Sequence, residues 1–399
     1  MTARCRSQAL LSAAAVRQRC ETVFAAARRD ETPHFRLDCA QLDAVADHVA
    51  SLTRRRYPDL AVPYHSRWRH FCAAGIDRAA LVAPAAEIAE QARARLDLAV
   101  VSVLLDAGAG PLWRFCEAET GRVLRRSEGL AVASLRAMQH GGFSADRGDP
   151  WRADAAALQA ITTETLGEAL QHGPGNELPG LESRARLLRG LGEVCAADPV
   201  RFGRPPRPGH LYDYWRGLDR PVAAAEILQI LLHELGPIWP GRISIDKVPL
   251  GDCGRHRAVP GDGLVPFHKL SQWLAYSLIE PLQAGGVEIA GLDALTGLAE
   301  YRNGGLFVDC GVVIPRDRAL ATRVLDAASE PVVEWRALTV ALLDRLAPRV
   351  RARLSKSEDE FPLACVLEGG SWAAGREIAF ARRPDGRPPF DITSDGTVF

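Results

Sequence analysis

Lysine is scarce in this sequence. Of the 49 basic residues in 399, only three are lysines, and they are Lys247, Lys269 and Lys356. Nearly all the positive charge is carried by arginine, and alanine is abundant, which suggests a GC-rich genome. Arginine is the usual basic residue of this sequence, and its side chain differs chemically from that of lysine. A lysine in such a sequence is therefore a candidate for a role that needs an ammonium group.

Net charge and long apolar runs are also missing. The 49 basic residues are balanced by 49 acidic ones, so the chain has no basic footprint for non-specific binding of nucleic acid. No apolar run approaches the length that spans a membrane, and the N-terminus lacks a signal-peptide pattern. We expect a cytoplasmic protein with neither a nucleic-acid nor a membrane partner.

The cysteines do not form a recognisable pattern. Nine occur singly, without any Cys-x-x-Cys pair, so they indicate neither a disulfide framework nor a zinc signature. Reduced, mostly buried thiols are the ordinary interpretation. The glycines after Asp106 match neither a dinucleotide fingerprint nor a phosphate-binding loop. The sequence predicts neither a metal ion nor another cofactor.

What the sequence does have is helical periodicity. Apolar residues recur at spacings of three and four along most of the chain, and alternating strand and helix units, which would indicate a doubly wound sheet, are absent. We predict a mainly α, compact helical fold with few short strands. Residues 1–399 are expected to form a single domain, with a division into two lobes at about residue 140 as the alternative. The stretch from residue 316 to about 354 predicts a helix that Pro331 can break.

The segment from Val265 to Val313 combines this periodicity with unusual polar residues. Phe267, Leu270 and Leu274 have the spacing of an amphipathic helix. The same spacing brings Lys269 close to Gln272 on a neighbouring face. Trp273 lies on the same face as these two residues, and His268 precedes the lysine.

Farther along this segment, three functional side chains stand together. Glu300, Tyr301 and Arg302 follow one another in an otherwise apolar stretch, where burying an unpaired charge is costly. One interpretation is a local ion pair beside a core tyrosine, and the other is a catalytic carboxylate. Asp309 comes later in the segment and is either a second carboxylate of the site or only the partner of an arginine.

Two earlier segments are candidates for binding. Residues 64–71 contain two histidines, two arginines and three large aromatic residues. They form either an arginine face stacked on aromatic rings or an anion clamp of Arg67 and Arg69 beside His65. Asp106 ends a strongly apolar section, either as a helix-terminal residue or as a carboxylate at the mouth of a pocket, with Trp113 shortly after it.

Four of these motifs together resemble one family over nearly the whole chain. They are Tyr64-His-Ser-Arg-Trp-Arg-His-Phe71, Leu105-Asp-Ala-Gly-Ala-Gly110, Val265-Pro-Phe-His-Lys-Leu-Ser-Gln272 and Glu300-Tyr-Arg-Asn-Gly-Gly305. The sequence resembles the uracil catabolism protein four family of fungi and bacteria, which is catalogued as a domain of unknown function. The resemblance implies a place in a pathway that converts uracil to its nucleotide, opens the ring and later releases urea.

A second, more distant resemblance implies a reaction. Phe267-His-Lys-Leu-Ser-Gln272 is similar to the Phe-Tyr-Lys-Arg-Ala-Gln motif of the queuosine-5′-phosphate N-glycosylase (queuosine salvage) family. Ala299-Glu-Tyr-Arg302 is similar to the Ala-Asp-Tyr-Arg of that family, at nearly the same distance downstream. Those proteins are all-helical, related in shape to DNA glycosylases, and cleave the N-glycosidic bond of a nucleotide with the matching carboxylate. Glu300 replaces the aspartate here, and Asn-Gly-Gly replaces Leu-Pro-Gln.

Together the two resemblances imply an N-glycosidase that acts on a small nucleotide-derived substrate. A ring-opened uridine nucleotide of the ribosylurea 5-phosphate type would give urea and ribose 5-phosphate through an oxocarbenium-like state, which a carboxylate stabilises. The implied catalytic residues are Glu300, Lys269 and Asp309. The implied substrate-binding residues are His65, Arg67, Arg69, Asp106, Trp113, His268, Gln272, Tyr301 and Arg302, with the arginines as phosphate ligands.

Two other functions stay open at this stage. One is a non-catalytic binding protein that holds an intermediate of the pathway or a partner enzyme. The other is a hydrolase of the ureido amide, although such enzymes usually need a metal or a Ser/Lys arrangement that the sequence does not clearly contain. Product analysis separates the three.

Overall fold

Helices form most of the protein, and the predicted mainly α fold is confirmed. The computed structural model describes residues 3–106, 108–239, 241 and 243–393. Within these ranges the strands have two or three residues each and pair two by two. The core is therefore built by helices.

The chain divides into two compact units that interleave in sequence. Unit 1 comprises Met1–His65, Gly241–Gln272 and Gly291–Phe399, and unit 2 comprises Ser66–Pro240 and Trp273–Ala290. Each unit is thus assembled from segments that are far apart along the chain.

Unit 1 contains seven described α-helices of its own and four shorter helical turns. The α-helices are α1 (Ala3–Leu10), α2 (Ala13–Arg28), α3 (Leu42–Arg56), α14 (Tyr301–Asp309), α15 (Glu330–Leu354), α16 (Leu363–Val366) and α17 (Trp372–Arg382). The turns are η1 (Cys39–Gln41), η6 (Leu292–Ala294), η7 (Arg318–Thr322) and the π-helical η8 (Leu367–Ser371).

Short pairs of strands connect the loops of unit 1. They pair as β1 (Phe35–Leu37) with β10 (Val313–Pro315), β5 (Ser244–Ile245) with β6 (Val248–Pro249), β7 (Cys253–Arg255) with β8 (Leu264–Pro266), and β11 (Val324–Asp326) with β12 (Asp391–Thr393). The first three pairs are antiparallel and the last is parallel.

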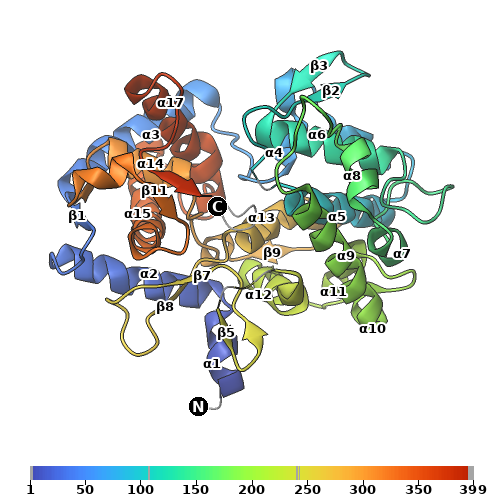
Figure 1. Cartoon of the computed structure of the whole chain (residues 1–399), viewed down its shortest axis with the longest axis horizontal. Helices are drawn as coiled ribbons and strands as arrows, with labels where there is room; N and C mark the ends of the chain where they lie inside the picture. Colours follow the sequence, from blue (N-terminus) through green and yellow to red (C-terminus); the bar gives the residue numbers. More distant parts are fainter. Residues whose placement is uncertain (1–2, 107, 240, 242, 394–399) are drawn as a thin grey trace. The chain divides into compact units, whose positions relative to one another are not determined.

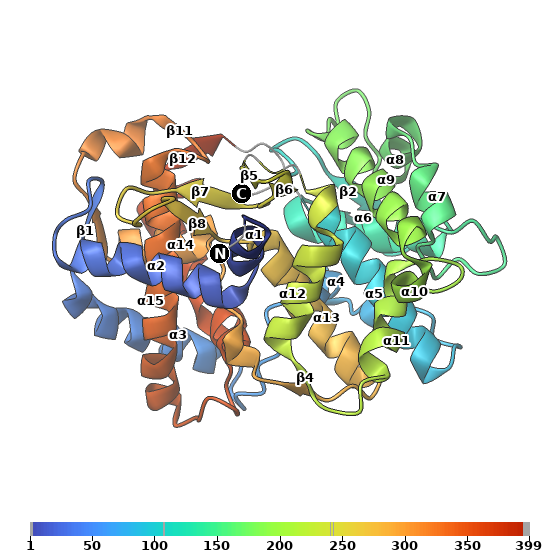
Figure 2. The same cartoon turned by 90° about the horizontal axis from the view of Figure 1, so that it is seen from below.

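Helix α15 is the centre of unit 1. It is buried on nearly all faces, with Val333, Leu338 and Leu342 among its fully covered residues. Helices α2 and α3 pack on it, and Figure 2 shows α2 crossing it. The prediction of a helix from residue 316 was wrong for its first part. The helix begins at Glu330, which places Pro331 in the first turn, where a missing N–H is harmless.

Unit 2 is a second group of helices. They are α4 (Trp68–Phe71), α5 (Ile88–Leu104), α6 (Arg126–Gln139), α7 (Ala155–Gln159), α8 (Thr163–Ala169), α9 (Leu181–Ala197), α10 (Pro199–Phe202), α11 (Leu211–Arg216) and α12 (Ala224–Glu234). Its short turns are η2 (Ala73–Gly75), η3 (Ala79–Leu81), η4 (Pro208–His210) and η5 (Gly236–Ile238), and its strand pairs are β2 (Phe115–Glu117) with β3 (Arg122–Leu124) and β4 (Val222–Ala223) with β9 (Ile289–Ala290). Figure 1 shows α5 at the middle of this group.

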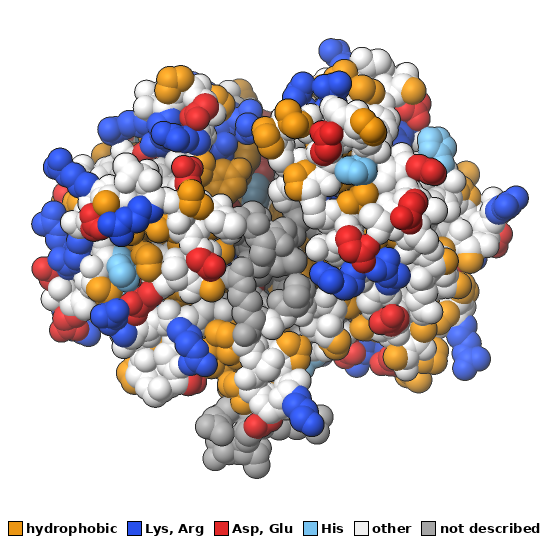
Figure 3. Space-filling model, in the orientation of Figure 1, with side chains coloured by type: hydrophobic (Ala, Val, Ile, Leu, Met, Phe, Trp, Pro, Cys, Tyr) orange, Lys and Arg blue, Asp and Glu red, His pale blue; other side chains and the backbone are white. Residues whose placement is uncertain are grey.

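Helix α13 (Lys269–Ala284) confirms the helix predicted from the central segment. The boundary between the units falls within it, after Gln272. Among the described residues, no helix has the length and apolar character needed to cross a membrane. Basic and acidic side chains are mixed over the face that Figure 3 shows, in keeping with their equal numbers.

Candidate functional site

The backbone just before Lys269 is strained. The chain leaves β8, passes Phe267 and reaches His268, which has a positive φ of 49°. A non-glycine residue in this region costs energy and persists only where its surroundings hold it. The buried imidazole of His268 donates from Nε2 to the Leu10 carbonyl at 2.9 Å, and burial lowers the pKa of the ring. His268 thus supports the start of α13, and Lys269 is the first residue of that helix.

A buried ion pair anchors the same turn. Arg336 of α15 donates from Nη1 and Nη2 to both carboxylate oxygens of Asp252 at 2.7 Å each, and the Asp252 carboxylate also accepts from the backbone N–H of Lys269 at 3.0 Å. Burial alone would raise the pKa of Asp252, but the charge and hydrogen bonds of Arg336 outweigh it and the pKa is lowered.

Arg336 reaches a second backbone segment as well. Its Nε donates to the carbonyl of Ala299 at 3.2 Å, and its guanidinium stacks 4.1 Å from the centroid of the Phe267 ring. One buried arginine therefore connects the start of α13 to the residue before Glu300. Sequence reasoning missed both Arg336 and Asp252, since they lie outside the motifs.

Glu300 is the N-cap of α14. Its side-chain oxygens accept the backbone N–H of Arg302 at 2.7 Å and that of Asn303 at 2.6 Å. The carboxylate thus lies at the positive end of the helix dipole. It is not held by an ion pair with Arg302, whose Nη1 donates to the Gly386 carbonyl and whose guanidinium stacks on the Tyr301 ring.

The environment of Glu300 opposes its ionisation. Burial raises the pKa of this carboxyl above its ordinary value, while the two backbone hydrogen bonds and the charges of Lys269 and His65 act in the other direction. The three predicted residues Glu300, Lys269 and His65 are therefore neighbours in unit 1. A partly buried carboxylate held close to a lysine and a histidine is the kind of site at which charge can be used chemically.

His65 has a carboxylate partner that the sequence did not indicate. Its Nδ1 lies 2.9 Å from Oε2 of Glu368 in the π-helical turn η8. The other oxygen of Glu368 accepts from Nη2 of Arg56 at 3.3 Å and from the hydroxyl of Tyr57 at 3.2 Å. The Trp372 ring lies 6.4 Å from the His65 ring, tilted by 38°. π-Helical turns occur frequently at functional sites, but no sequence periodicity predicts one.

Two other predicted residues of unit 1 have partners within the fold. The amide of Gln272 is buried, where it accepts the Thr296 N–H at 2.9 Å and donates to the Thr296 hydroxyl. Asp309, at the far end of α14 from Glu300, pairs with the guanidinium of Arg383 at 2.5 and 2.8 Å. This pairing supports the second interpretation of Asp309, as the partner of an arginine.

The remaining predicted residues belong to unit 2. Arg67 is fully buried, with Nη1 3.0 Å from Asp106, Nε donating to the Ser102 hydroxyl at 2.7 Å, and its guanidinium 5.5 Å from the Trp273 ring. Burial lowers its pKa, and the charge of Asp106 opposes that effect. These contacts favour the interpretation of an arginine stacked on an aromatic ring.

Arg69 and Trp113 are also engaged within unit 2. Arg69 forms an ion pair with Glu280 at 2.6 Å, and the buried indole of Trp113 donates to the Leu170 carbonyl at 2.9 Å. Their role in substrate binding stays a prediction.

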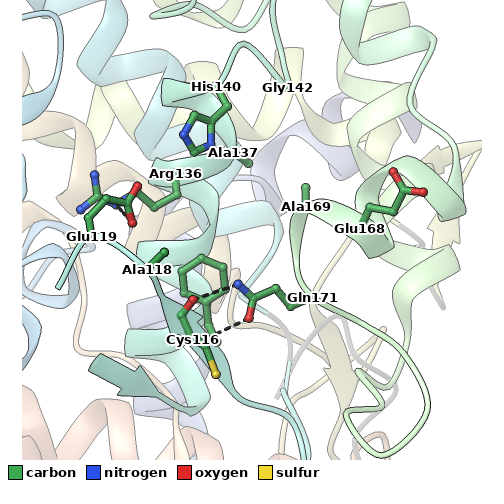
Figure 4. A pocket seen from close by; sticks show the side chains of 11 residues that line it. Cys116, Ala118, Glu119, Arg136, Ala137, His140, Gly142, Glu168, Ala169 and Gln171 are labelled. Atoms are coloured by element: carbon green, nitrogen blue, oxygen red, sulfur yellow. Dashed lines mark hydrogen bonds and ion pairs between the residues drawn. The ribbon is translucent and has the colours of Figure 1, made fainter. Parts of the chain in front are cut away.

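A pocket of about 310 Å³ also lies in unit 2, and it contains none of the predicted residues. Figure 4 shows it beside β2 and α6. Its polar groups are largely bound by the chain itself. The amide of Gln171 exchanges two 2.9 Å hydrogen bonds with the backbone of Cys116, and Arg136 donates to the buried Glu117. Nowhere in the described ranges do three or more His, Cys, Asp or Glu side chains gather in a way that could hold a metal ion.

Comparison with known proteins gives the family. A family model described as "Protein of unknown function (DUF1688)" matches residues 9–399. The chain belongs to this family. It is 37% identical over 407 residues to "Uracil catabolism protein 4" of Lachancea kluyveri, covering 92% of each protein. It is 38% identical over 404 residues to "Protein urg3" of Schizosaccharomyces pombe, covering 98% of each.

Proposed function

We propose that this protein is an enzyme of uracil catabolism that hydrolyses the N-glycosidic bond of a ring-opened uridine nucleotide. Water and a ribosylurea 5-phosphate would give urea and ribose 5-phosphate. The pathway rests on the name of the Lachancea kluyveri relative. The reaction rests on one observation, which is the partly buried Glu300 carboxylate fixed by two backbone N–H groups with Lys269 and His65 near it.

The chemistry of the substrate explains why such a carboxylate fits. When the bond between the anomeric carbon and the ureido nitrogen breaks, positive charge develops on the ribose ring. A carboxylate already in position stabilises that charge without reorganising. Glu300 can then accept a proton from the water that attacks the anomeric carbon, because its raised pKa makes it a better base than an ordinary glutamate.

Lys269 has a distinct role in this proposal. Its ammonium group favours the ionised form of Glu300, and it can bind the hydroxyls of the ribose. The phosphate-binding role of Arg67, Arg69 and Arg302 stays a prediction.

The test is product analysis with purified protein and ribosylurea 5-phosphate. Urea and ribose 5-phosphate should appear in equal amounts, and Glu300→Gln should lower kcat by about a hundredfold or more, the scale seen when one electrostatic stabiliser is lost. Glu377→Gln, an exposed carboxylate on α17, is the control and should leave kcat unchanged. Ammonia as the first product would indicate a ureido hydrolase instead, and binding without turnover would indicate a binding protein.

A further inference from the structure

We propose that His65 is the proton donor to the departing nitrogen, and that Glu368 positions it for this step. This inference rests on the proposed function and assigns to one side chain of the site a task that Glu300 cannot perform. The geometry of the π-helical turn η8 supports it, because this turn contacts both His65 and the start of α14.

The reaction needs an acid. The ureido nitrogen is a poor leaving group as an anion, so a proton must reach it as the bond to the anomeric carbon breaks. Glu300, as the negative charge opposite the oxocarbenium ion, is not suited to supply it. Histidine is the residue type whose charge changes closest to neutral pH, whereas an ordinary lysine releases its proton only at much higher pH. His65 is therefore the better donor.

The pairing with Glu368 fixes the orientation of the ring. Because a carboxylate only accepts, Nδ1 of His65 carries a proton toward Oε2 of Glu368. Nε2 is then the nitrogen left for the substrate, as in a carboxylate–histidine pair of a hydrolase. Arg56 and Tyr57 donate to the other oxygen of Glu368 and hold the carboxylate in place.

The turn η8 is built to hold this pair in place. A Cβ at Gly370 would lie 2.6 Å from the carbonyl oxygen of Val49 and 2.7 Å from the hydroxyl of Thr53. Only glycine therefore lets η8 lie directly on α3, and the chain just beyond these contacts supplies Arg56 and Tyr57. The close approach of two backbones explains why glycine follows Glu368.

The same turn also contacts the helix that holds Glu300. The hydroxyl of Ser371, the last residue of η8, donates to the side-chain oxygen of Asn303 at 2.9 Å. The backbone N–H of Asn303 in turn binds Glu300. Helix α17 packs against both α14 and α3, and the three lie in one group in Figure 1. Turn η8 leads directly into α17. One turn thus sets the positions of His65 and Glu300 together.

The charges around His65 come from several elements. The acidic neighbours are Glu368 on η8 and Glu300 at the start of α14, and the basic ones are Lys269 on α13 and Arg56 on α3. Arg376 stacks at 5.8 Å on the ring of Trp372, which is the aromatic neighbour of His65. The ring therefore has charged groups of both signs around it.

In the proposed step, the C–N bond breaks and its electron pair goes to the nitrogen. The nitrogen takes the Nε2 proton of His65, and urea leaves. A lone pair of the ribose ring oxygen stabilises the positive charge that develops at the anomeric carbon. The water oxygen then bonds to that carbon, its proton passes to Glu300, and exchange with solvent returns His65 and Glu300 to their starting states.

The experiment compares two leaving groups. His65→Ala should lower kcat at least a hundredfold with ribosylurea 5-phosphate, the range of general acid catalysis. It should lower kcat less than tenfold with 4-nitrophenyl ribofuranoside 5-phosphate, whose leaving group needs no proton. Glu300→Gln should impair both substrates, and Glu377→Gln neither. Equal losses with both substrates for His65→Ala, or no loss with ribosylurea 5-phosphate, would overturn the assignment while leaving the glycosidase proposal intact.

Glu368→Gln tests the positioning role. It should lower kcat more than tenfold with KM nearly unchanged, because the ring loses the carboxylate that fixes its orientation. A ¹⁵N-edited spectrum of the imidazoles should show proton occupancy at Nδ1 of His65 in the wild type and a changed signal in the variant. An unchanged kcat and an unchanged spectrum would show that Glu368 does not position His65. If the wild type releases no urea, both proposals fall together.

Discussion

At the residue scale, Glu300 combines a structural task with the proposed catalytic one. Its two side-chain oxygens cap α14. Its negative charge would stabilise a developing cation, although burial raises the pKa of this carboxyl and so opposes its ionisation. A site that needed only a helix cap would use a less costly residue, such as serine or threonine. The retained charge is the physical reason to look for chemistry at this position.

The first prediction separates these two tasks by pH. The raised pKa of Glu300 means that its protonated form favours folding, so this contribution is fully present below the unfolded pKa and is lost as pH rises through the folded one. Glu300→Gln loses one acceptor of the cap, at about 1 kcal/mol, but it avoids the buried charge. The variant should therefore be more destabilised relative to wild type at pH 4 than at pH 7.

Melting temperatures at the two pH values provide the measurement for this prediction. Glu300→Asp is the matched variant, since it keeps both a charge and a favoured capping side chain, and it should follow the wild-type pH dependence. A Gln variant whose deficit grows toward pH 7 would contradict the assignment of a raised pKa.

Glu117 shows the opposite behaviour. Burial would raise the pKa of this fully covered carboxyl, but hydrogen bonds from Arg78, Thr120 and Arg136 hold it at about 2. Its stabilising contribution is thus present above 4.5, the ordinary value, and is lost as pH falls toward 2.

The second prediction follows from this arrangement. Glu117→Gln removes the buried counter-charge of Arg78 and the nearer of the two counter-charges of Arg136, which should cost about 3–5 kcal/mol of unfolding free energy at pH 7. The loss should shrink as the pH is lowered from 4.5 toward 2. Urea denaturation across this range measures it. Glu119→Gln removes the more exposed neighbour of Arg136 and should change the unfolding free energy little; an equal effect of both variants would refute the argument.

At the scale of elements, the contact between α14 and α17 controls the candidate site. The two helices meet where Gly375 faces the carbonyl of Arg302, and a Cβ at Gly375 would lie 2.1 Å from that oxygen. Backbone cannot yield as a flexible side chain does, so glycine is required here. This carbonyl belongs to the first turn of α14, whose N–H groups hold Glu300.

The third prediction uses this contact. Gly375→Ala should destabilise the protein by about 1–3 kcal/mol through overpacking, and it should lower kcat because α14 must shift. Gly190→Ala on α9 is the matched control: its Cβ would meet Ile238 at an ordinary 3.5 Å, and replacing a mid-helix glycine should stabilise by about 0.5–1 kcal/mol. Denaturant unfolding measures whether each variant is more or less stable than the wild type. A Gly375→Ala variant as stable as Gly190→Ala would show that the two backbones are not in contact.

At the scale of the whole molecule, each unit depends on distant parts of the chain. In unit 2, the segment Trp273–Ala290 gives β4 its partner strand β9. Ser277 in this segment accepts from the Arg67 backbone at 2.9 Å and from the Trp68 indole at 2.8 Å. Without this segment, buried donors of unit 2 lose their partners.

The fourth prediction tests this dependence. A fragment of residues 66–240 should fail to show a cooperative thermal transition by circular dichroism. The same fragment joined through a flexible Gly/Ser linker, as long as the removed stretch, to residues 273–290 should regain one. A cooperative transition of residues 66–240 alone would show that they fold without residues 273–290.

The sequence by itself determined the helical class and the family, because helical periodicity and contiguous motifs are local properties of the chain. It also singled out Lys269, Glu300 and His65, which the structure places in one unit. It could not show that Glu300 caps a helix, because the residue before a helix is defined only once the helix is in place.

Only the tertiary structure decided which partners these residues have. His65 and Glu368 are 303 positions apart, and Arg336 and Asp252 are 84 apart. No local pattern links such pairs, since they meet only when segments far apart in the sequence pack together in unit 1. The assignment of residues 273–290 to unit 2 and the π-helical form of η8 are likewise products of packing. The sequence specified the charged groups of the candidate site, and the burial of apolar helices around them determined which charges became neighbours.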